Sequence, residues 1–300
     1  MSKIYISILT LCCLLLGYTT NISAEIVHQE RSLYRNILVD DQGDSRCLKF
    51  NVRSSKTNQS CLYKSDPQRL VFNYTKLLFS GLLLIEKPKK ILIIGLGGGT
   101  MSNTLHQLYP QSVITNVEID PAVVKVARQY FGFFENENVS SVIQDGRIFI
   151  KRAIIKKQKY DWIILDAFNG DYIPEHLLTQ EFIQETKSIL NKGGVLSANT
   201  FSVSDLYAHE SATYKSVFGD FYNVRNVKNS NRIILAINGK LPSLTLINQR
   251  TKALQERLTP FAVDLIQVSK QMTSTRIEQD WPESTKVLTD QFSPANLLNN

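Results

Sequence analysis

The chain has few residues of the kinds that bind metals or form covalent cross-links. It has four cysteines and four histidines among 300 residues, and two of the cysteines fall within the first 13 positions. No CxxC pair and no His-rich cluster is present, and the four histidines are far apart, at His28, His106, His176 and His209. Because zinc sites in proteins use closely spaced cysteine and histidine ligands, the absence of such clusters means that the sequence does not support a metal site of this kind.

A stripe of basic residues is also missing. The formal net charge is +7 and the sequence pI is about 9.1, but the lysines and arginines are scattered and do not alternate with aromatic residues along one segment. Proteins that follow a nucleic acid backbone gather such residues on one face. We therefore predict a mildly basic, solvated surface and no nucleic-acid partner.

The N-terminal 24 residues resemble a secretory signal. Lys3 precedes an apolar run over residues 4–17, and a polar stretch follows that ends at the small residues Ser23 and Ala24. The run is shorter than the about 20 apolar residues that a membrane-spanning helix needs. We expect an exported protein, periplasmic or secreted, without a stable membrane span once residues 1–24 are removed. The alternative is an uncleaved N-terminal anchor.

Removal of this segment leaves two cysteines, Cys47 and Cys61. They lie in two predicted neighbouring strands, and export would place them in a compartment where a disulfide persists. The sequence leaves two possibilities open, a disulfide or two unpaired, half-buried thiols.

The rest of the chain divides into three parts. Residues 25–65 alternate apolar and polar positions around a turn, which is typical of a small antiparallel β-domain. Residues 66–240 alternate predicted strands and helices, which indicates an α/β fold with a Rossmann-like, doubly wound and mostly parallel sheet. Residues 241–300 form a helical and extended tail, with one helix expected over residues 246–272.

A glycine-rich turn follows the first strand of this α/β region. Residues 91–94 are apolar and mostly β-branched, as in a strand buried on both faces, and Gly95, Gly97 and Gly99 come directly after them. Glu118 ends the next strand, 23 residues after Gly95. This separation is close to the roughly 20 residues that bring a carboxylate to the hydroxyls of a ribose. The pattern favours nucleoside binding over a purely structural turn followed by a solvated acid.

Two further acids follow the next predicted strands. Asp145 and Asp166 each come directly after a strand, as Glu118 does. Ligands of an open α/β sheet lie at the carboxyl ends of its strands, so these acids should meet at one edge. Asp145 could accept a hydrogen bond from an adenine amino group, and Asp166 could hold or deprotonate an amine. Each could instead cap the helix that follows it.

The motifs in this region, in their order and spacing, resemble those of the spermidine synthase (polyamine aminopropyltransferase) family. That family has the fold of class I S-adenosylmethionine-dependent methyltransferases. The motifs are ILIIGLGGGT, VEIDPAVVKVAR, QDGRIFI, YDWIILDAFNGDYIPEHLLTQEF and LNKGGVLSANTFS. SLYRNILVDDQGDSRCLKF is similar to the family's N-terminal β-domain, and KVLTDQFSPANLL is similar to the tail of its spermidine-synthase-like branch.

The resemblance implies a role for individual residues. Glu118 matches the acid that binds the ribose hydroxyls, Asp145 the acid beside adenine, and Asp166 the acid that deprotonates the attacking amine. Tyr74 falls where a tyrosine lines the polyamine cavity, and Gln59 falls near a glutamine that contacts the nucleoside.

The polyamine half of the motifs departs from the family pattern. Gly98 stands where the family's glycine loop has an aspartate that helps to hold the aminopropyl ammonium. Asn169 occupies the place of a second aspartate in the loop after Asp166, and Asp171 comes two residues later as a candidate substrate-binding acid. The resemblance therefore implies a retained nucleoside site and an altered amine site.

Three functions remain open at this point. The first is transfer of an aminopropyl group from decarboxylated S-adenosylmethionine to a small amine such as putrescine, without a metal. The second is methyl transfer from S-adenosylmethionine to a small molecule, and the third is a non-catalytic exported domain that binds a nucleoside or polyamine. The family resemblance also implies a possible homodimer.

Overall fold

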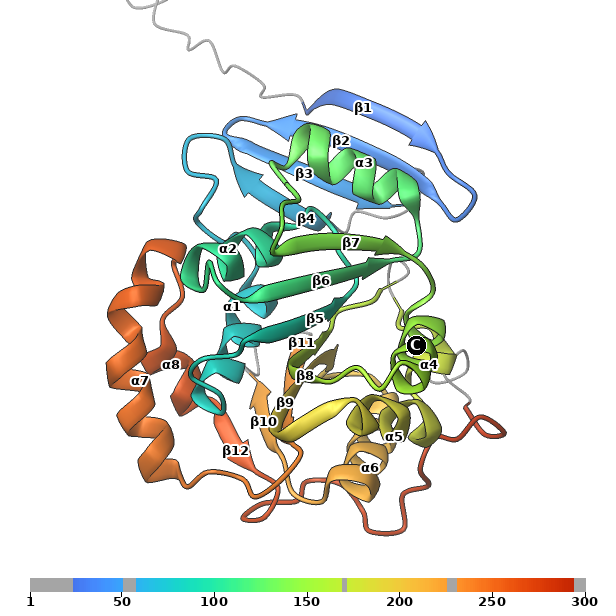
Figure 1. The fold of residues 1–300 in the computed structure, drawn as a ribbon, viewed down its shortest axis with the longest axis vertical. Coiled ribbons are helices and arrows are strands. Elements are labelled where there is room, and N and C mark those ends of the chain that lie inside the picture. Colours follow the sequence, from blue (N-terminus) through green and yellow to red (C-terminus); the bar gives the residue numbers. More distant parts are fainter. Residues whose placement is uncertain (1–23, 51–57, 169–171, 226–230, 294–300) are drawn as a thin grey trace, which may run out of the picture.

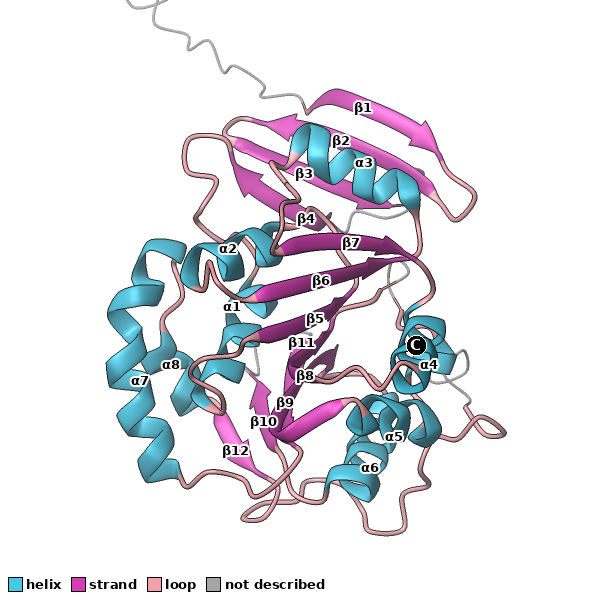
Figure 2. Ribbon diagram, viewed as in Figure 1, coloured by secondary structure: helices cyan, strands magenta, loops and turns pink. Residues whose placement is uncertain are grey.

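Two β-sheets, one antiparallel and one mostly parallel, organise the chain (Figures 1 and 2). The structure is a computed structural model that describes residues 24–50, 58–168, 172–225 and 231–293. The predicted signal segment therefore lies outside the described residues, except for Ala24.

The smaller sheet comes first in the chain and is antiparallel throughout. Its order is β1 (Glu25–Arg31), β2 (Asn36–Gln42), β3 (Ser45–Phe50) and β4 (Asn58–Tyr63), each paired with the next. One apolar face of this sheet packs on helix α3 (Pro121–Tyr130) of the larger domain, which Figure 1 shows lying across the strands. The β-domain predicted from the alternating pattern is confirmed, and this packing fixes it above the central sheet.

Cys47 of β3 and Cys61 of β4 form a disulfide. The two residues are directly opposite in the strand register, with their Cα atoms 4.2 Å apart. Of the two possibilities that the sequence left open, the structure therefore contains the disulfide.

The larger sheet has eight strands in the order β12-β10-β11-β9-β8-β5-β6-β7. The five strands from β9 to β7 run parallel, and β11, β10 and β12 pair antiparallel at the other edge. This is the predicted Rossmann-like arrangement, including the terminal hairpin of β10 and β11. The strands are β5 (Lys90–Ile94), β6 (Val113–Glu118), β7 (Val139–Ile143), β8 (Tyr160–Leu165), β9 (Leu190–Phe201), β10 (Tyr222–Arg225), β11 (Asn231–Ile237) and β12 (Met272–Ser274).

Helices cover both faces of this sheet, which explains why β5 and β8 are apolar on both sides. One face packs against α1 (Asn73–Leu78), η1 (Phe79–Leu83), α2 (Thr100–Leu108), α3, α7 (Leu244–Leu258), η3 (Thr259–Phe261) and α8 (Leu265–Lys270). The other face packs against α4 (Gly146–Ile155), η2 (Glu175–Leu177), α5 (Gln180–Ser188) and α6 (Leu206–Phe218). Figure 2 shows the two helical layers on opposite sides of the strands.

The single helix expected over residues 246–272 is wrong. The structure has two helices there, α7 and α8, separated by a turn that contains Pro260 and Ala262, whose φ is +57°. Proline lacks the N–H that a continuous helix needs, and a positive φ turns the backbone out of the helical path. After α8 the chain adds β12 to the edge of the central sheet. Among the described residues, no helix combines the length and apolarity that a membrane span requires.

Candidate active site

A cavity of about 670 Å³ lies between the small sheet and the carboxyl ends of β5, β6, β8 and β9. Its walls include residues from both sheets, from α1 and from η2. Most of the residues predicted to act together line this one cavity: Gln59, Tyr74, Gly95, Gly97, Glu118, Asp145 and Asp166. The sequence thus predicted which strand ends meet, because the carboxyl ends of parallel strands share one edge of the sheet.

The glycine loop after β5 brings the backbone close to the cavity floor. Gly95, Gly97 and Gly99 all have positive φ, at +98°, +56° and +74°. A Cβ on Gly95 would lie 2.3 Å from the carbonyl oxygen of Asp166, so no other residue fits between these two strand ends. Gly99 does not line the cavity and instead caps the N-terminus of α2. The loop therefore places backbone N–H groups beside the site.

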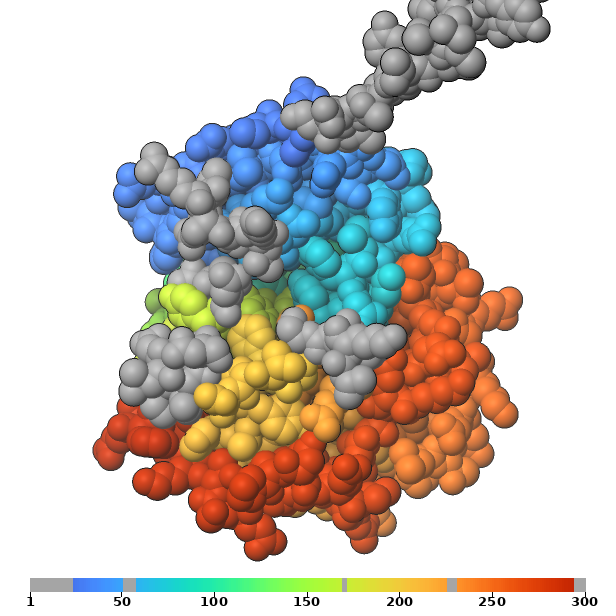
Figure 3. Space-filling view, turned by 180° about the vertical axis from the view of Figure 1, so that it is seen from behind, coloured from blue at the N-terminus to red at the C-terminus, as the bar shows by residue number. Residues whose placement is uncertain are grey.

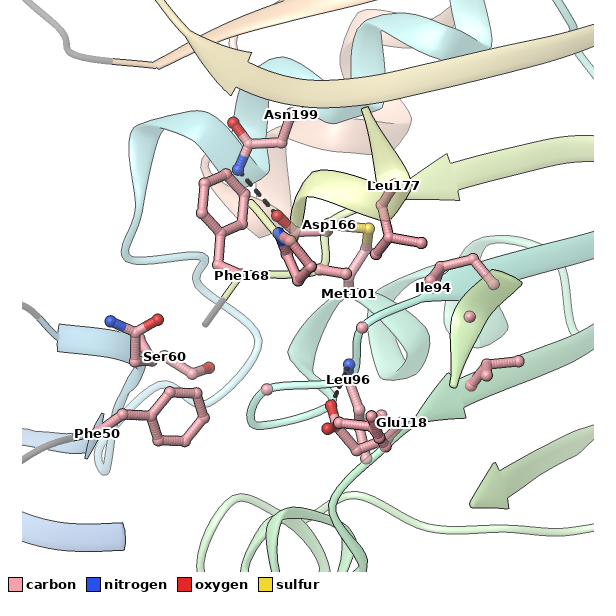
Figure 4. Close-up of a pocket in the computed structure, with 18 of the residues that line it drawn as sticks. Phe50, Ser60, Ile94, Leu96, Met101, Glu118, Asp166, Phe168, Leu177 and Asn199 are labelled. Carbon is pink, nitrogen blue, oxygen red and sulfur yellow. Dashed lines mark hydrogen bonds between the residues drawn. The ribbon is translucent and has the colours of Figure 1, made fainter. Parts of the chain in front are cut away.

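Glu118 is held in place by two backbone N–H groups, of which one belongs to the glycine loop and the other follows β6. Its carboxylate accepts hydrogen bonds from the backbone nitrogens of Leu96 and Asp120, both at 3.1 Å, and the Leu96 bond is drawn in Figure 4. Burial raises its pKa, while these two bonds and the nearby Arg35 oppose the rise. A buried carboxylate oriented in this way is suited to accept hydrogen bonds from two hydroxyls of one ligand.

Asp145 has two partners in the structure. One carboxylate oxygen caps α4 by accepting from the Ile148 nitrogen at 2.9 Å, and the other lies 2.8 Å from Nε2 of His176. The His176 hydrogen bond is the main cause that lowers the pKa of Asp145. The capping role is thus present, and both side chains also line the cavity. The predicted contact with an adenine amino group stays a prediction.

Asp166 directly follows β8, and the residue is half-buried in the cavity wall. Burial raises its pKa from 3.8 to about 7, and a hydrogen bond from Asn199 opposes part of this rise. Nδ2 of Asn199 donates to the Asp166 carboxylate at 2.8 Å, as Figure 4 shows, and Oδ1 of Asn199 accepts from Asn231 at 3.1 Å. A carboxylate with a pKa near neutrality is well matched to accept a proton from a reacting group.

Aromatic side chains form the wall near Asp166. Tyr74 stacks on Phe72 with ring centroids 5.6 Å apart, and Phe168 meets Phe201 edge to face at 5.5 Å. Burial, together with the charge of Asp166, raises the pKa of Tyr74 and keeps its hydroxyl protonated. This hydroxyl lies 3.4 Å from the backbone oxygen of Gln59. Aromatic faces near a carboxylate provide a suitable environment for an alkyl ammonium.

Of the three remaining positions predicted at the amine site, the structure describes Gly98 only. Asp171 and Asn169 lie outside the described residues. Gly98 packs tightly, because a Cβ there would lie 2.6 Å from Oγ of Ser60 and 3.0 Å from the ring of Phe131. An aspartate at this position would therefore require the Ser60 hydroxyl and the Phe131 ring to shift.

The structure also adds a cation that sequence reasoning missed. Arg35, between β1 and β2, has a side chain only 7% exposed and lies over the ring of Phe50, with 4.4 Å between Cζ and the ring centroid. Its Nε is 3.7 Å from the Asp120 carboxylate, and Nη1 is 3.5 Å from the Phe168 carbonyl. Arg35 therefore connects the small sheet with the loops after β6 and β8.

Asn199 and His176 were missed as well. Asn199 could have been noticed, since it is a polar residue inside the buried strand sequence VLSANTF. Nothing in the local sequence distinguishes His176, because its contact with Asp145 joins elements 31 residues apart. Within the part of the chain that the structure describes, no group of three or more histidine, cysteine or acidic side chains is arranged to hold a metal ion.

Comparisons with known proteins agree with this geometry. A profile described as "Spermine/spermidine synthase domain" matches residues 72–227. A curated polyamine aminopropyltransferase of Vibrio vulnificus is 49% identical over 291 residues, which cover 96% of each chain. A probable spermidine synthase from Corynebacterium glutamicum has the same fold, with a TM-score of 0.70 at 21% identity over 89% of this chain and 97% of that one.

A second solved structure is a spermidine synthase in complex with the transition state analogue AdoDATO. It matches with a TM-score of 0.59 at 20% identity and covers 82% of each chain. Because the family profile spans half of the sequence and the Vibrio relative matches nearly all of it, the chain belongs to the spermine/spermidine synthase family.

Proposed function

We propose that the protein is a polyamine aminopropyltransferase that transfers an aminopropyl group from decarboxylated S-adenosylmethionine to a small amine. The observation that supports this most directly is the position of Asp166. Its half-buried carboxyl, with a pKa of about 7, lines the same cavity as Glu118, the residue suited to bind a ribose. Nucleoside recognition and proton acceptance are therefore combined in one site, and the match to a curated aminopropyltransferase over most of the chain favours this reaction over methyl transfer.

The residues fit the donor in three places. Glu118 would accept hydrogen bonds from the two ribose hydroxyls, and the N–H groups of the glycine loop would lie beside the nucleoside. Asp145 and His176 would border the base, and Asp166 and Glu118 would give the cavity the negative charge that a sulfonium requires. The donor supplies an electrophilic carbon next to its sulfonium.

The protein's own contribution is to position and deprotonate the amine. A neutral amine nitrogen must approach this carbon from the side opposite to the sulfur, and the aromatic wall at Tyr74 and Phe168 would align it. As the new C–N bond forms, the C–S bond breaks and its electrons leave with the sulfur of methylthioadenosine. Asp166 takes the proton that the nitrogen loses. Alignment of this kind can supply several of the about 7–11 kcal/mol that proximity makes available.

The test is a product assay with purified protein. Incubation with decarboxylated S-adenosylmethionine and a panel of amines that includes putrescine should release methylthioadenosine. Asp166→Asn should abolish the release, while Asp220→Asn, a surface carboxylate near Lys215, should leave it unchanged. Release of S-adenosylhomocysteine from S-adenosylmethionine, with no methylthioadenosine from any amine, would replace this proposal with methyl transfer.

We also propose that the protein is exported. The signal-like pattern of residues 1–24 supports this location, and so does the Cys47–Cys61 disulfide, because disulfides persist in oxidising compartments. Cell fractionation and N-terminal sequencing of the recovered protein test it, and a reduced protein with an intact N-terminus in the cytoplasm would refute it. The homodimer stays a prediction that sedimentation can measure.

A further inference from the structure

Two charged residues that the proposed reaction does not use, Arg147 and Asp290, meet in the structure. Arg147 belongs to QDGRIFI at the start of α4, and Asp290 belongs to KVLTDQFSP in the tail, 143 residues later. Nη1 of Arg147 lies 2.6 Å from one carboxylate oxygen of Asp290, and Nη2 lies 2.7 Å from the other. Such a two-pronged contact is among the strongest and most directional ion pairs in proteins.

Other contacts fix the same tail segment, residues 286–292, which we call the tail latch. Asp290 also accepts from the hydroxyl of Thr179 at 2.7 Å, and its backbone nitrogen donates to Glu181 at 3.0 Å. The carbonyl of Leu288 accepts from the Gln180 nitrogen at 2.7 Å, and the Leu288 side chain is fully buried. Figure 3 shows the tail, in red, running along the lower edge of the molecule. The latch is therefore bound to the N-terminus of α5.

Arg147 connects this latch to the cavity wall. Its side chain is 10% exposed and makes a second two-pronged pair with Glu185 of α5, at 2.9 and 3.1 Å. Nη1 also lies 3.4 Å from the carbonyl oxygen of His176. Two residues before Arg147 is Asp145, whose carboxylate lies 2.8 Å from the His176 ring. The guanidinium thus contacts both the tail and the backbone of His176, and Arg147 lies two residues after Asp145 on the same chain segment.

We propose that the tail latch is a positioning element for nucleoside binding. Asp290, through Arg147, holds the start of α4 and the η2 segment in the relative position that places Asp145 and His176 at the cavity. This inference rests on the proposed function for its ligand, since it takes the base of the nucleoside to lie against these two residues. Loss of Asp290 leaves Arg147 paired with Glu185, so the fold should survive while the wall loses its fixed position.

The first measurement is nucleoside affinity at a temperature where every variant is folded. We expect Asp290→Asn and Arg147→Lys to raise the Kd for methylthioadenosine by about threefold to tenfold, the usual coupling within one contact network. The KM for the amine should stay within about twofold, because the latch does not reach the aromatic wall. Glu86→Gln is the matched control, since its 2.8 Å pair with Arg250 joins helix α7 to the loop between η1 and β5, and Glu86 does not line the cavity.

A second measurement needs no ligand. Hydrogen exchange of the backbone amides in residues 172–182 should be faster in Asp290→Asn than in the wild type or in Glu86→Gln. Unchanged exchange in this segment, or a lower melting temperature with an unchanged Kd, would overturn the latch and leave only a stabilising contact. If methylthioadenosine does not bind even to the wild type, the proposed function fails, and the exchange measurement still decides whether the latch positions this wall.

Discussion

Replacing Asp166 by asparagine should abolish catalysis and at the same time stabilise the fold. The carboxyl has an ordinary pKa of 3.8 and a pKa of about 7 in the folded protein, because burial disfavours its charged form. Below pH 3.8 the group is protonated in both the folded and the unfolded state and has no effect on stability. As the pH rises the unfolded state loses its proton first, so stability falls until the folded carboxyl also ionises near pH 7.

The size of this effect follows from the two pKa values. Each pKa unit corresponds to about 1.4 kcal/mol, so full ionisation costs the folded state about 4 kcal/mol. An asparagine at position 166 can still accept the hydrogen bond that Asn199 donates. The new side-chain N–H groups at position 166 need an acceptor, and without one the folded state loses about 1–3 kcal/mol. That cost does not change with pH. The free energy of unfolding of the variant, relative to that of the wild type, should therefore rise by about 2–3 kcal/mol between about pH 5 and pH 8.5.

Urea unfolding of both proteins at these two pH values measures the difference. Glu210, another buried acid with a pKa of about 7, titrates in both proteins and cancels in the comparison. In the wild type, kcat/KM should rise through about pH 7 as Asp166 loses its proton. A stability difference that does not change with pH, or an Asp166→Asn variant that retains turnover, would refute the assignment of Asp166 as a buried base.

Three other changes test separate parts of the structure. Asn199→Ala removes the hydrogen bond that lowers the pKa of Asp166, so the rise of kcat/KM should move to higher pH. An unchanged pH profile would show that Asn199 does not set the pKa of Asp166. Replacing both cysteines of the disulfide, 14 residues apart, by serine should cost about 3 kcal/mol in urea unfolding, and an unchanged midpoint would contradict this. Gly98→Asp should cost about 1–3 kcal/mol through overpacking. Adding Ser60→Gly to the Gly98→Asp variant should restore part of the lost free energy of unfolding, because it removes the Oγ that the new side chain would contact. If the effects of the two substitutions are simply additive, this contact is not the cause of the loss.

Local patterns were sufficient to predict the sheet and the acids at its edge. Strands β5 and β8 are apolar on both faces, and β5, β6 and β8 end at or next to a glycine or an acid, so the positions and the direction of these strands can be read from consecutive residues. Glu118, Asp145 and Asp166 follow from this, because the carboxyl ends of parallel strands lie together. The tail was harder to predict, since β12 forms only by pairing with β10, a strand about 50 residues earlier.

What the sequence determined by itself was the fold class and which acids at the strand ends line one cavity. Tertiary structure decided the chemical state of these groups. The pKa of Asp166 depends on how deeply the assembled walls bury it, and Arg35 reaches the cavity only because the small sheet packs on α3. The contacts of Asp290 with Arg147 and of His176 with Asp145 likewise join segments that are distant in the chain. Burial and long-range contacts are properties of the packed molecule, so no local pattern could have specified them.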